Sequence, residues 1–460
     1  MRTPLMGQAI MTLQSGQTIQ DYIDAELHAR PYLRLSNNQR IFHFAFRTGE
    51  KNANDEWAFL LDMMRETYRW DRLPAHVPVD HKPDASPRFF MHDENDIIYR
   101  YERHTEFTNL TLIFKNAVGM SGKRPEYFPP DATNVLPEHL ISTFPGELIQ
   151  ALWLDMSADE TPCQPSELTA LFGHDNFTGS HVADDMASIF CSMKTAPHKD
   201  GHFGFTRVLI QNNKLSDERT GRLIQRILEM ETYRHFAMLS LPLVRELTPQ
   251  LAETENTLQR ISKGMTHIGG ERPTEVLEKE LIQITDVTAR IEKLSALTSY
   301  RLAASKAYDA LIQSRIADLR ETRIENFQTI SQFLGRRLVP AIRTCFAFQR
   351  RLDDLADRAQ RNNTLLRTRI EMQIQIQNNS LLHSMEQRAR AQIRLQEIVE
   401  LLSIAAITYY MVSLLAYVLK GISSDFIDQH HRAILAVAVP VIAILHYTIL
   451  RQVRKSMRKD

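Results

Sequence analysis

The chain has 460 residues, which is enough for two or three domains with sizeable cores. Its 55 basic and 55 acidic side chains balance, which argues against nucleic-acid binding, because such proteins usually present a net basic face. The three cysteines, Cys163, Cys191 and Cys345, lie far apart, so we expect free thiols in a reducing compartment and no disulfide framework.

The N-terminal residues 1–17 carry scattered Gln, Thr and Gly. They lack the continuous apolar core of a signal peptide. We therefore expect the N-terminal part of the chain to be cytosolic.

Residues 1 to about 215 differ in composition from the rest, because they hold eleven of the seventeen His and all three Trp. Helical patterns at 21–29 and 55–70 lie between runs that are typical of strands. This alternation predicts an N-terminal α/β domain with a mixed sheet, within a chain whose fold class is α+β. The predicted strands are Ile41–Phe46, Arg88–Met91, Ile97–Tyr101, Phe107–Phe114, Leu148–Asp155, Ala187–Met193 and Phe203–Ile210.

Titratable residues concentrate in the segment 97–107. If this segment is one strand, the two-residue period places four polar side chains on one face: Arg100, Glu102, His104 and Glu106. Arg103 would face the other side. Two carboxylates and a histidine side by side are typical of a general acid–base site or a cation site. The alternative is a solvent-facing strand with cross-strand ion pairs.

A second candidate site is Leu27-His28-Ala-Arg30-Pro31, where a predicted helix ends before a proline. His28 and Arg30 could serve a ligand there, or they could cap the helix and form an ion pair. No P-loop, dinucleotide fingerprint, zinc-protease motif or nucleophile elbow occurs. The sequence therefore indicates no cofactor, leaves any metal unknown, and gives no catalytic residue beyond these candidates.

The middle of the chain is strongly helical. Residues 274–334 and 341–420 contain neither Gly nor Pro, and both segments are rich in good helix formers. Apolar residues from Leu281 to Leu297 recur at steps of three and four, which indicates a helical core stripe. We expect a helical bundle or coiled-coil stalk in which asparagine pairs such as Asn378 and Asn379 either set the register or lie on the surface.

Proline and glycine predict the boundaries of these helices. Pro242 and Pro249 are expected to bend or break a helix over 216–260. The segment 267–273 reads as a turn, and Gly335 and Pro340 are expected to mark a further boundary.

Two long uncharged segments lie near the C-terminus, at Leu401–Leu419 and Ala433–Leu450. A helix needs about 20 apolar residues to cross the hydrocarbon core of a bilayer, so both segments are long enough. The alternative is a buried hairpin in a soluble core. We expect two transmembrane helices embedded in membrane lipid.

Basic residues predict the orientation of these helices. The tail after the second segment is rich in Arg and Lys, and Arg388, Arg390 and Arg394 precede the first segment. The connecting loop 420–432 carries two basic residues that Asp425 and Asp428 offset. We therefore expect a multi-pass protein of the inner (plasma) membrane with both termini in the cytosol.

Small and hydroxyl-bearing residues form one stripe along the first apolar segment: Ser403, Ala406, Tyr410, Ser413 and Tyr417. Such residues favour close helix packing in lipid. The same stripe could instead line a pore in a homo-oligomer.

Short motifs through most of the chain resemble a bacterial family of uncharacterised membrane-anchored proteins. The motifs are Leu27-His-Ala-Arg-Pro31, Glu102-Arg-His-Thr-Glu-Phe107, Glu231-Thr-Tyr-Arg234, Ser299-Tyr-Arg301, Ala303-Ala-Ser305, Arg343-Thr-Cys345, Leu365-Leu-Arg-Thr-Arg369 and Leu402-Ser-Ile-Ala-Ala-Ile-Thr-Tyr-Tyr410. The resemblance implies a bacterial inner membrane but no mechanism.

The layout also resembles that of the CorA-type magnesium transporters. These combine a cytosolic α/β domain, long stalk helices, two C-terminal spans and a basic tail, in a homopentamer whose first span lines the pore. In CorA that span ends in a Gly-Met-Asn motif. Here it ends Tyr417-Val-Leu-Lys-Gly-Ile-Ser423, which puts magnesium selectivity in doubt.

The sequence thus predicts a cytosolic α/β domain (1–215), a long-helix stalk (216–400), a transmembrane hairpin (401–450) and a basic cytosolic tail (451–460). We expect a membrane-anchored homo-oligomer that self-associates through the stalk and the first transmembrane helix. Its cytosolic domain would bind, sense or regulate, with an unknown ligand or ion. The two alternatives are a CorA-like channel and a membrane-tethered enzyme that uses Glu102, His104 and Glu106.

Overall fold

The computed structural model describes residues 33–49, 53–68, 88–94, 96–121, 124–136, 143–197, 204–265, 273–421 and 425–457. The chain divides into two compact units. The first unit comprises Met1–Thr266 with Thr285–Gln360, and the second comprises His267–Ile284 with Arg361–Asp460. A mixed sheet and long helices together confirm the predicted α+β class.

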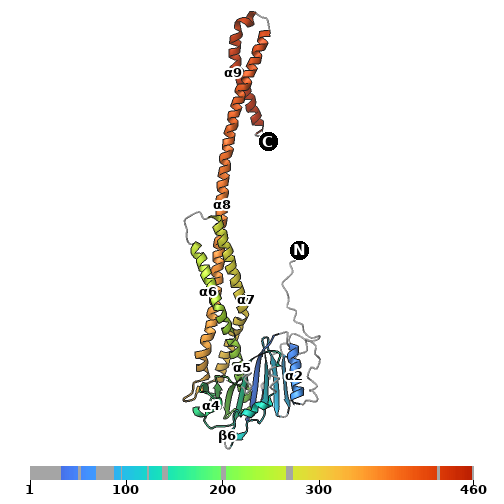
Figure 1. Ribbon diagram of the computed structural model, residues 1–460, viewed down its shortest axis with the longest axis vertical. Coiled ribbons are helices and arrows are strands. Elements are labelled where there is room, and N and C mark those ends of the chain that lie inside the picture. Colours follow the sequence, from blue (N-terminus) through green and yellow to red (C-terminus); the bar gives the residue numbers. More distant parts are fainter. Residues whose placement is uncertain are drawn as a thin grey trace. The chain divides into compact units, whose positions relative to one another are not determined.

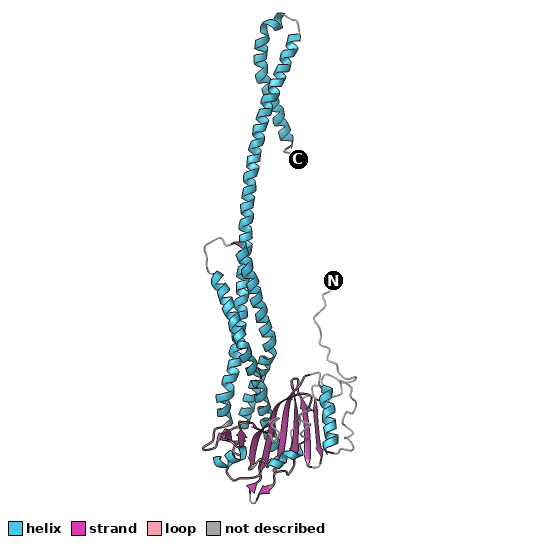
Figure 2. Cartoon of the chain, in the orientation of Figure 1, coloured by secondary structure: helices cyan, strands magenta, loops and turns pink. Residues whose placement is uncertain are grey.

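The first unit is built on a sheet of ten strands among the described residues, with the order β12-β8-β9-β11-β7-β1-β4-β3-β2 and β10 paired to β11 (Figure 2). Its neighbours are antiparallel except β11 and β7, which are parallel, so the sheet is mixed. The strands are β1 (Arg40–Arg47), β2 (Phe89–Glu94), β3 (Ile97–Arg103), β4 (Phe107–Phe114), β7 (Glu147–Ser157), β8 (Phe177–Val182), β9 (Ala187–Ser192), β10 (Ala196–Pro197), β11 (Gly204–Asn212) and β12 (Thr322–Arg323). A small separate ribbon pairs β5 (Met120–Ser121) with β6 (Arg124–Pro125).

All seven predicted strands overlap strands of this sheet. The sequence did not reveal β8, whose Phe-Thr-Gly-Ser-His-Val sequence is largely polar. Of the two predicted N-terminal helices, the second corresponds to α2 (Ala53–Tyr68), and the one at 21–29 lies outside the described residues.

One face of the sheet carries an aromatic core. The alternation of side chains along β1 directs Phe42, Phe44 and Phe46 to this face, where Trp57 of α2 and Trp153 of β7 belong to the same cluster. Helix α4 (Pro165–Phe172) and the 3-10 turn η2 (Pro130–Val135) contribute to the same core. Figure 1 shows α2 beside the strands β1 to β4.

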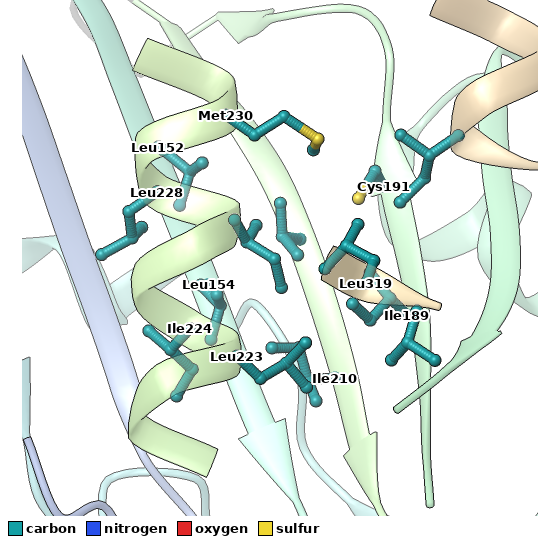
Figure 3. Packing of buried hydrophobic residues seen from close by; sticks show 14 of the residues in the cluster. Leu152, Leu154, Ile189, Cys191, Ile210, Leu223, Ile224, Leu228, Met230 and Leu319 are labelled. Atoms are coloured by element: carbon teal, nitrogen blue, oxygen red, sulfur yellow. The ribbon is translucent and has the colours of Figure 1, made fainter. Parts of the chain in front are cut away.

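The opposite face carries an aliphatic core under α5 (Asp217–Met238). Figure 3 shows Leu223, Ile224 and Leu228 of α5 near Leu152 and Leu154 of β7. Each such side chain contributes about 1.5–3 kcal/mol when it is fully buried, so this face is a main source of the unit's stability.

Long helices complete the chain: α6 (Ser240–Met265), α7 (Thr274–Leu319), α8 (Ile330–Gly421) and α9 (Asp425–Met457). The predicted break near Pro242 is present, since α5 ends at Met238 and α6 begins at Ser240. Pro249, in contrast, lies inside α6 and does not end it.

The boundary predicted at Gly335 and Pro340 is wrong, because both residues lie inside α8. Leu334, Leu338 and Ile342 are buried in the aliphatic core on either side of the proline, and this packing holds the helix together. Tertiary packing outweighs the lost backbone hydrogen bond here.

The chain turns instead at 320–329, inside a segment predicted to be one helix. Here β12 pairs with β8, and Arg320 and Asn326 adopt positive φ angles of 48° and 69°. The Glu321 carboxylate accepts hydrogen bonds from the backbone N–H groups of Ile330 (2.6 Å) and Ser331 (3.0 Å) at the start of α8. This side chain satisfies helix donors that would otherwise lack partners.

The second unit contains the C-terminal part of α8 and all of α9. The two have apolar segments long enough to cross a membrane, and almost none of the described residues in these segments is buried. After Gly421 the chain reverses direction, so that α9 runs back, in red in Figure 1.

Candidate functional site

The predicted polar strand ends earlier than expected. Strand β3 stops at Arg103, and residues 104–106 form the turn into β4, closed by a hydrogen bond from the His104 N–H to the Phe107 carbonyl (2.8 Å). His104 and Glu106 therefore do not continue the face of Arg100 and Glu102. The turn interrupts the period of two on which that prediction depended.

Arg100 and Glu102 lie together on the α5 side of the sheet. The guanidinium Nη2 of Arg100 donates to Oε1 of Glu102 at 2.7 Å, and the two side chains are only 5% and 13% exposed. This buried pair leaves neither charge without a partner, which a buried ion pair requires.

Glu106 has different partners, on α7. Its carboxylate accepts hydrogen bonds from both Nη atoms of Arg301, the second at 2.8 Å, and from the Tyr308 hydroxyl at 2.7 Å. Burial raises the pKa of Tyr308 to about 12, so that its hydroxyl keeps the proton it donates. Glu106 thus joins the β3–β4 turn to α7, and two of the motifs noted in the sequence meet here.

His104 packs its ring on Phe107, with the centroids 4.2 Å apart. Arg103 faces the other side of the sheet, where its Nε lies 4.0 Å from Oε2 of Glu56. His28 and Arg30 lie outside the described residues. The structure thus brings Arg100 and Glu102 together and separates them from the other candidates.

A buried histidine that the sequence did not single out lies beside this pair. The ring nitrogens of His43 on β1 are 2.8 Å from the Thr111 hydroxyl on β4 and 2.9 Å from the Thr232 hydroxyl on α5. Burial lowers the pKa of His43 to about 3, and repulsion from the positive charge of Arg100, followed by that of His104, acts in the same direction. The imidazole is therefore neutral near pH 7, where it can both donate and accept one hydrogen bond.

A small cavity adjoins His43, Arg100 and Glu102, with a volume of about 20 Å³. A cavity needs roughly 10–15 Å³ to hold one water molecule, so this one has room for a water and not for an organic substrate. A neutral histidine and a paired carboxylate beside a cavity of this size form a structural polar network.

Two further buried carboxylates were missed. Glu56 on α2 accepts hydrogen bonds from Thr108 (2.6 Å) and Tyr101 (3.2 Å), and burial raises its pKa. Asp155 on β7 forms a bidentate ion pair with Arg40, both contacts being 2.9 Å. The signal for Asp155 was one charge directly after the apolar run Ala151–Leu154 of this strand.

Cysteine thiols and metal ligands are two further kinds of group that can carry chemistry. Burial raises the pKa values of the thiols of Cys163, Cys191 and Cys345, which keeps them protonated near neutral pH. In the part of the chain that the structure describes, no three His, Cys, Asp or Glu side chains are grouped as metal ligands would be.

The apolar parts of α8 and α9 are the other candidate for function. In the most apolar stretch of 18 residues in α8, 6% of the residues are buried. In the corresponding stretch of α9, none is buried. In the stripe of α8, the hydroxyls of Ser403 and Ser413 donate to the carbonyls of Val399 and Tyr409, each at 2.8 Å. Tyr410 and Tyr417 are exposed, as is Ala406.

Two comparisons relate the chain to known proteins. No curated protein matches the chain in sequence. A family model described as "Protein of unknown function (DUF3422)" matches residues 19–457, which is nearly the whole chain. This match agrees with the uncharacterised family that the motifs resemble, and it gives no support to the resemblance to CorA-type transporters. The chain belongs to the DUF3422 family of proteins of unknown function.

Proposed function

We propose that this chain is a membrane-anchored homo-oligomer whose N-terminal part has a binding, sensing or regulatory role in the bacterial cytosol. Two helices would cross the inner membrane with both chain ends in the cytosol. The observation that carries this proposal is the exposed apolar surface of α8 and α9.

A soluble protein would bury such segments. A core helix of a soluble protein can be as long and as apolar as these segments, but most of its residues are buried. Here almost none of the residues in the two segments is buried. Helices satisfy their backbone groups internally, which a lipid core demands. The basic residues that flank the two segments favour cytosolic termini.

The part of α8 that precedes the first apolar segment supports self-association. Heptad spacing places two rows of residues on one face, a d row (Ile374, Leu381, Arg388, Leu395, Leu402) and an a row (Asn378, Met385, Gln392, Val399). The apolar members are between 48% and 72% exposed in the single chain. Asn378 at an a position would favour a partner with the same residue in register, which a second copy provides.

The two alternatives receive less support. A channel requires polar groups along its pore, and the hydroxyls of Ser403 and Ser413 donate their protons within their own helix, which leaves them only acceptor lone pairs to offer. An enzyme that uses Glu102, His104 and Glu106 requires these side chains to converge, and they have separate partners. Ion flux in reconstituted liposomes, for divalent and monovalent cations, would distinguish a channel from an anchor.

The topology can be tested with two matched cysteine variants. We expect Ser424→Cys, in the short loop, to react with a membrane-impermeant maleimide added to intact spheroplasts. Ser456→Cys, in the basic tail, is expected to react only after permeabilisation, because lipid separates it from the reagent. The three native cysteines lie before residue 350, on the proposed cytosolic side, and provide an internal negative control.

Two results would contradict the proposed anchoring. One is labelling of Ser456→Cys in intact spheroplasts. The other is release of the whole chain from membranes by alkaline carbonate, which does not extract helices that span a bilayer.

Self-association can be tested on the heptad face. We expect Leu381→Glu with Leu395→Glu to turn the detergent-purified oligomer into monomers. Each leucine contributes about 1.5–3 kcal/mol when it is buried between copies, so losing two corresponds to a decrease of more than roughly a hundredfold in association. Light scattering coupled to size-exclusion chromatography measures the mass.

The matched control is Ile376→Glu with Ile393→Glu, which replaces two exposed apolar residues on other faces of the same helix. This double variant should keep the mass of the wild-type oligomer. A monomeric wild-type protein, or equal masses for the two double variants, would refute the proposed interface.

A further inference from the structure

A second pocket, on the first unit, is lined by arginines. It lies where α5 begins, where α7 ends and where β8 turns into β9, and its volume is about 220 Å³. Leu223 and Leu319, both labelled in Figure 3, contribute apolar lining. Its charged lining residues are Arg219, Arg222, Arg226, Arg320 and Asp318.

The helical repeat explains why the charges meet. Arg219, Arg222 and Arg226 follow one another at steps of three and four, so they occupy one face of α5. Arg320 comes from the turn after α7, where its positive φ of 48° marks the abrupt change of direction. Residues nearly a hundred positions apart are thereby gathered around one cavity.

Acidic residues offset only part of this charge. Asp318 lies 3.9 Å from Arg226, and Asp184 pairs with Arg320 from outside the lining, at 2.5 Å. Nη1 of Arg219 contacts the sulfur of Met186 at 3.5 Å, a weak acceptor that carries no charge. Glu218 in the first turn of α5 interacts electrostatically with Arg222 as well. Four arginines against Asp318, Asp184 and Glu218 still leave a positive formal charge of one around the pocket.

We propose that this pocket binds the phosphate groups of an anionic ligand. Guanidinium groups present planar, permanently charged donors that match phosphate oxygens in pairs. The first turn of α5 is the positive end of a 22-residue helix, and Asp217 and Glu218 in that turn offset part of its dipole, so the arginines supply most of the attraction. The volume is about ten times that of the cavity beside His43, so it admits more than one water-sized group.

This inference gives a ligand class to the binding role proposed above, and it rests on that role. The phosphate could belong to a soluble compound or to the headgroup of a lipid, and both offer the same oxygens to the arginines. The membrane-topology and oligomer experiments do not involve the pocket, so either proposal can fail without the other.

The test uses the full-length protein in detergent, titrated with inorganic tripolyphosphate in a calorimeter. We expect binding that weakens as NaCl is raised, because salt screens exposed charges. Arg219→Gln and Arg222→Gln should each weaken binding about tenfold or more, since each removes charge-assisted hydrogen bonds.

The control is Arg34→Gln. Arg34 is 79% exposed and pairs with Glu218 in the first turn of α5, but it does not line the pocket. Its replacement removes the same charge from the same helix end and should change affinity less than about twofold, as expected for screened surface charges. An unchanged melting temperature, read from tryptophan fluorescence, confirms that each variant is folded.

A second titration, with dioctanoyl phosphatidic acid and dioctanoyl phosphatidylcholine, identifies the source of the phosphate. Preference for phosphatidic acid over tripolyphosphate assigns a lipid headgroup, and the reverse preference assigns a soluble ligand. The proposal is overturned if neither anion binds, or if Arg219→Gln and Arg222→Gln bind as wild type does.

Discussion

Replacing Asp155 by alanine is expected to lower the free energy of unfolding of the first unit by about 3–5 kcal/mol. The Asp155 carboxylate is fully buried and accepts hydrogen bonds from Arg40, from the Trp153 indole (2.8 Å) and from the Phe128 backbone N–H (2.8 Å). Arg40 is only 8% exposed, so the substitution leaves a buried guanidinium without its counter-charge.

Urea denaturation followed by tryptophan fluorescence measures this effect, since all three tryptophans lie within residues 1–215. The matched control is Glu147→Ala, which breaks the ion pair with Arg47 on the same sheet. Both partners of that pair are at least half exposed, so the expected loss is below about 1 kcal/mol. Equal losses for the two variants would show that the Asp155 network does not stabilise the sheet.

The sequence predicted the sheet well, and it failed where distant contacts decide the structure. The seven predicted strands are rich in apolar and aromatic residues, and their local pattern is sufficient. Strand β8 lacks that pattern because it is shaped by its neighbour: a Cβ on Gly179 would lie 2.8 Å from the ring of Phe327. A residue some 150 positions away thus explains the glycine in this strand.

The helix boundaries show the same limit. Residues 320–329 contain neither Gly nor Pro, so local propensity continues the helix through them. Pairing of β12 with β8 and capping by Glu321 end it instead. At Pro340 the converse holds, because buried neighbours maintain a helix that the proline alone would interrupt.

The candidate sites were even less accessible from sequence. The strand period correctly placed Arg100 and Glu102 on one face, but it extended that face past a turn that nothing in the sequence marked. The partners of His43 lie 68 and 189 residues away, and the arginine pocket combines α5 with the end of α7. Only the folded topology brings these residues together.

The stability of the first unit is expected to fall in acid because of His43. Its pKa is about 3 when folded and about 6.5 when unfolded, so below pH 6.5 the unfolded chain binds a proton that the folded chain does not. The stabilisation is therefore complete above pH 6.5 and is lost as the pH falls toward 3. Each pH unit in that window lowers the free energy of unfolding by about 1.4 kcal/mol, which amounts to about 2 kcal/mol between pH 6.5 and 5.

The variant His43→Gln isolates this contribution, because glutamine can bond to both Thr111 and Thr232 but does not titrate. His235 is partly buried, and desolvation lowers its pKa to about 4, but it is present in both proteins and cancels in the difference. The difference in unfolding free energy between wild type and His43→Gln should therefore shrink by about 2 kcal/mol from pH 6.5 to 5. His383→Gln serves as the control for replacing a histidine outside the first unit, since residue 383 belongs to the second unit. A constant difference between wild type and His43→Gln over this range would mean that His43 binds a proton as readily in the folded protein as in the unfolded chain. Both threonine hydroxyls would then have to accept hydrogen bonds from the protonated ring.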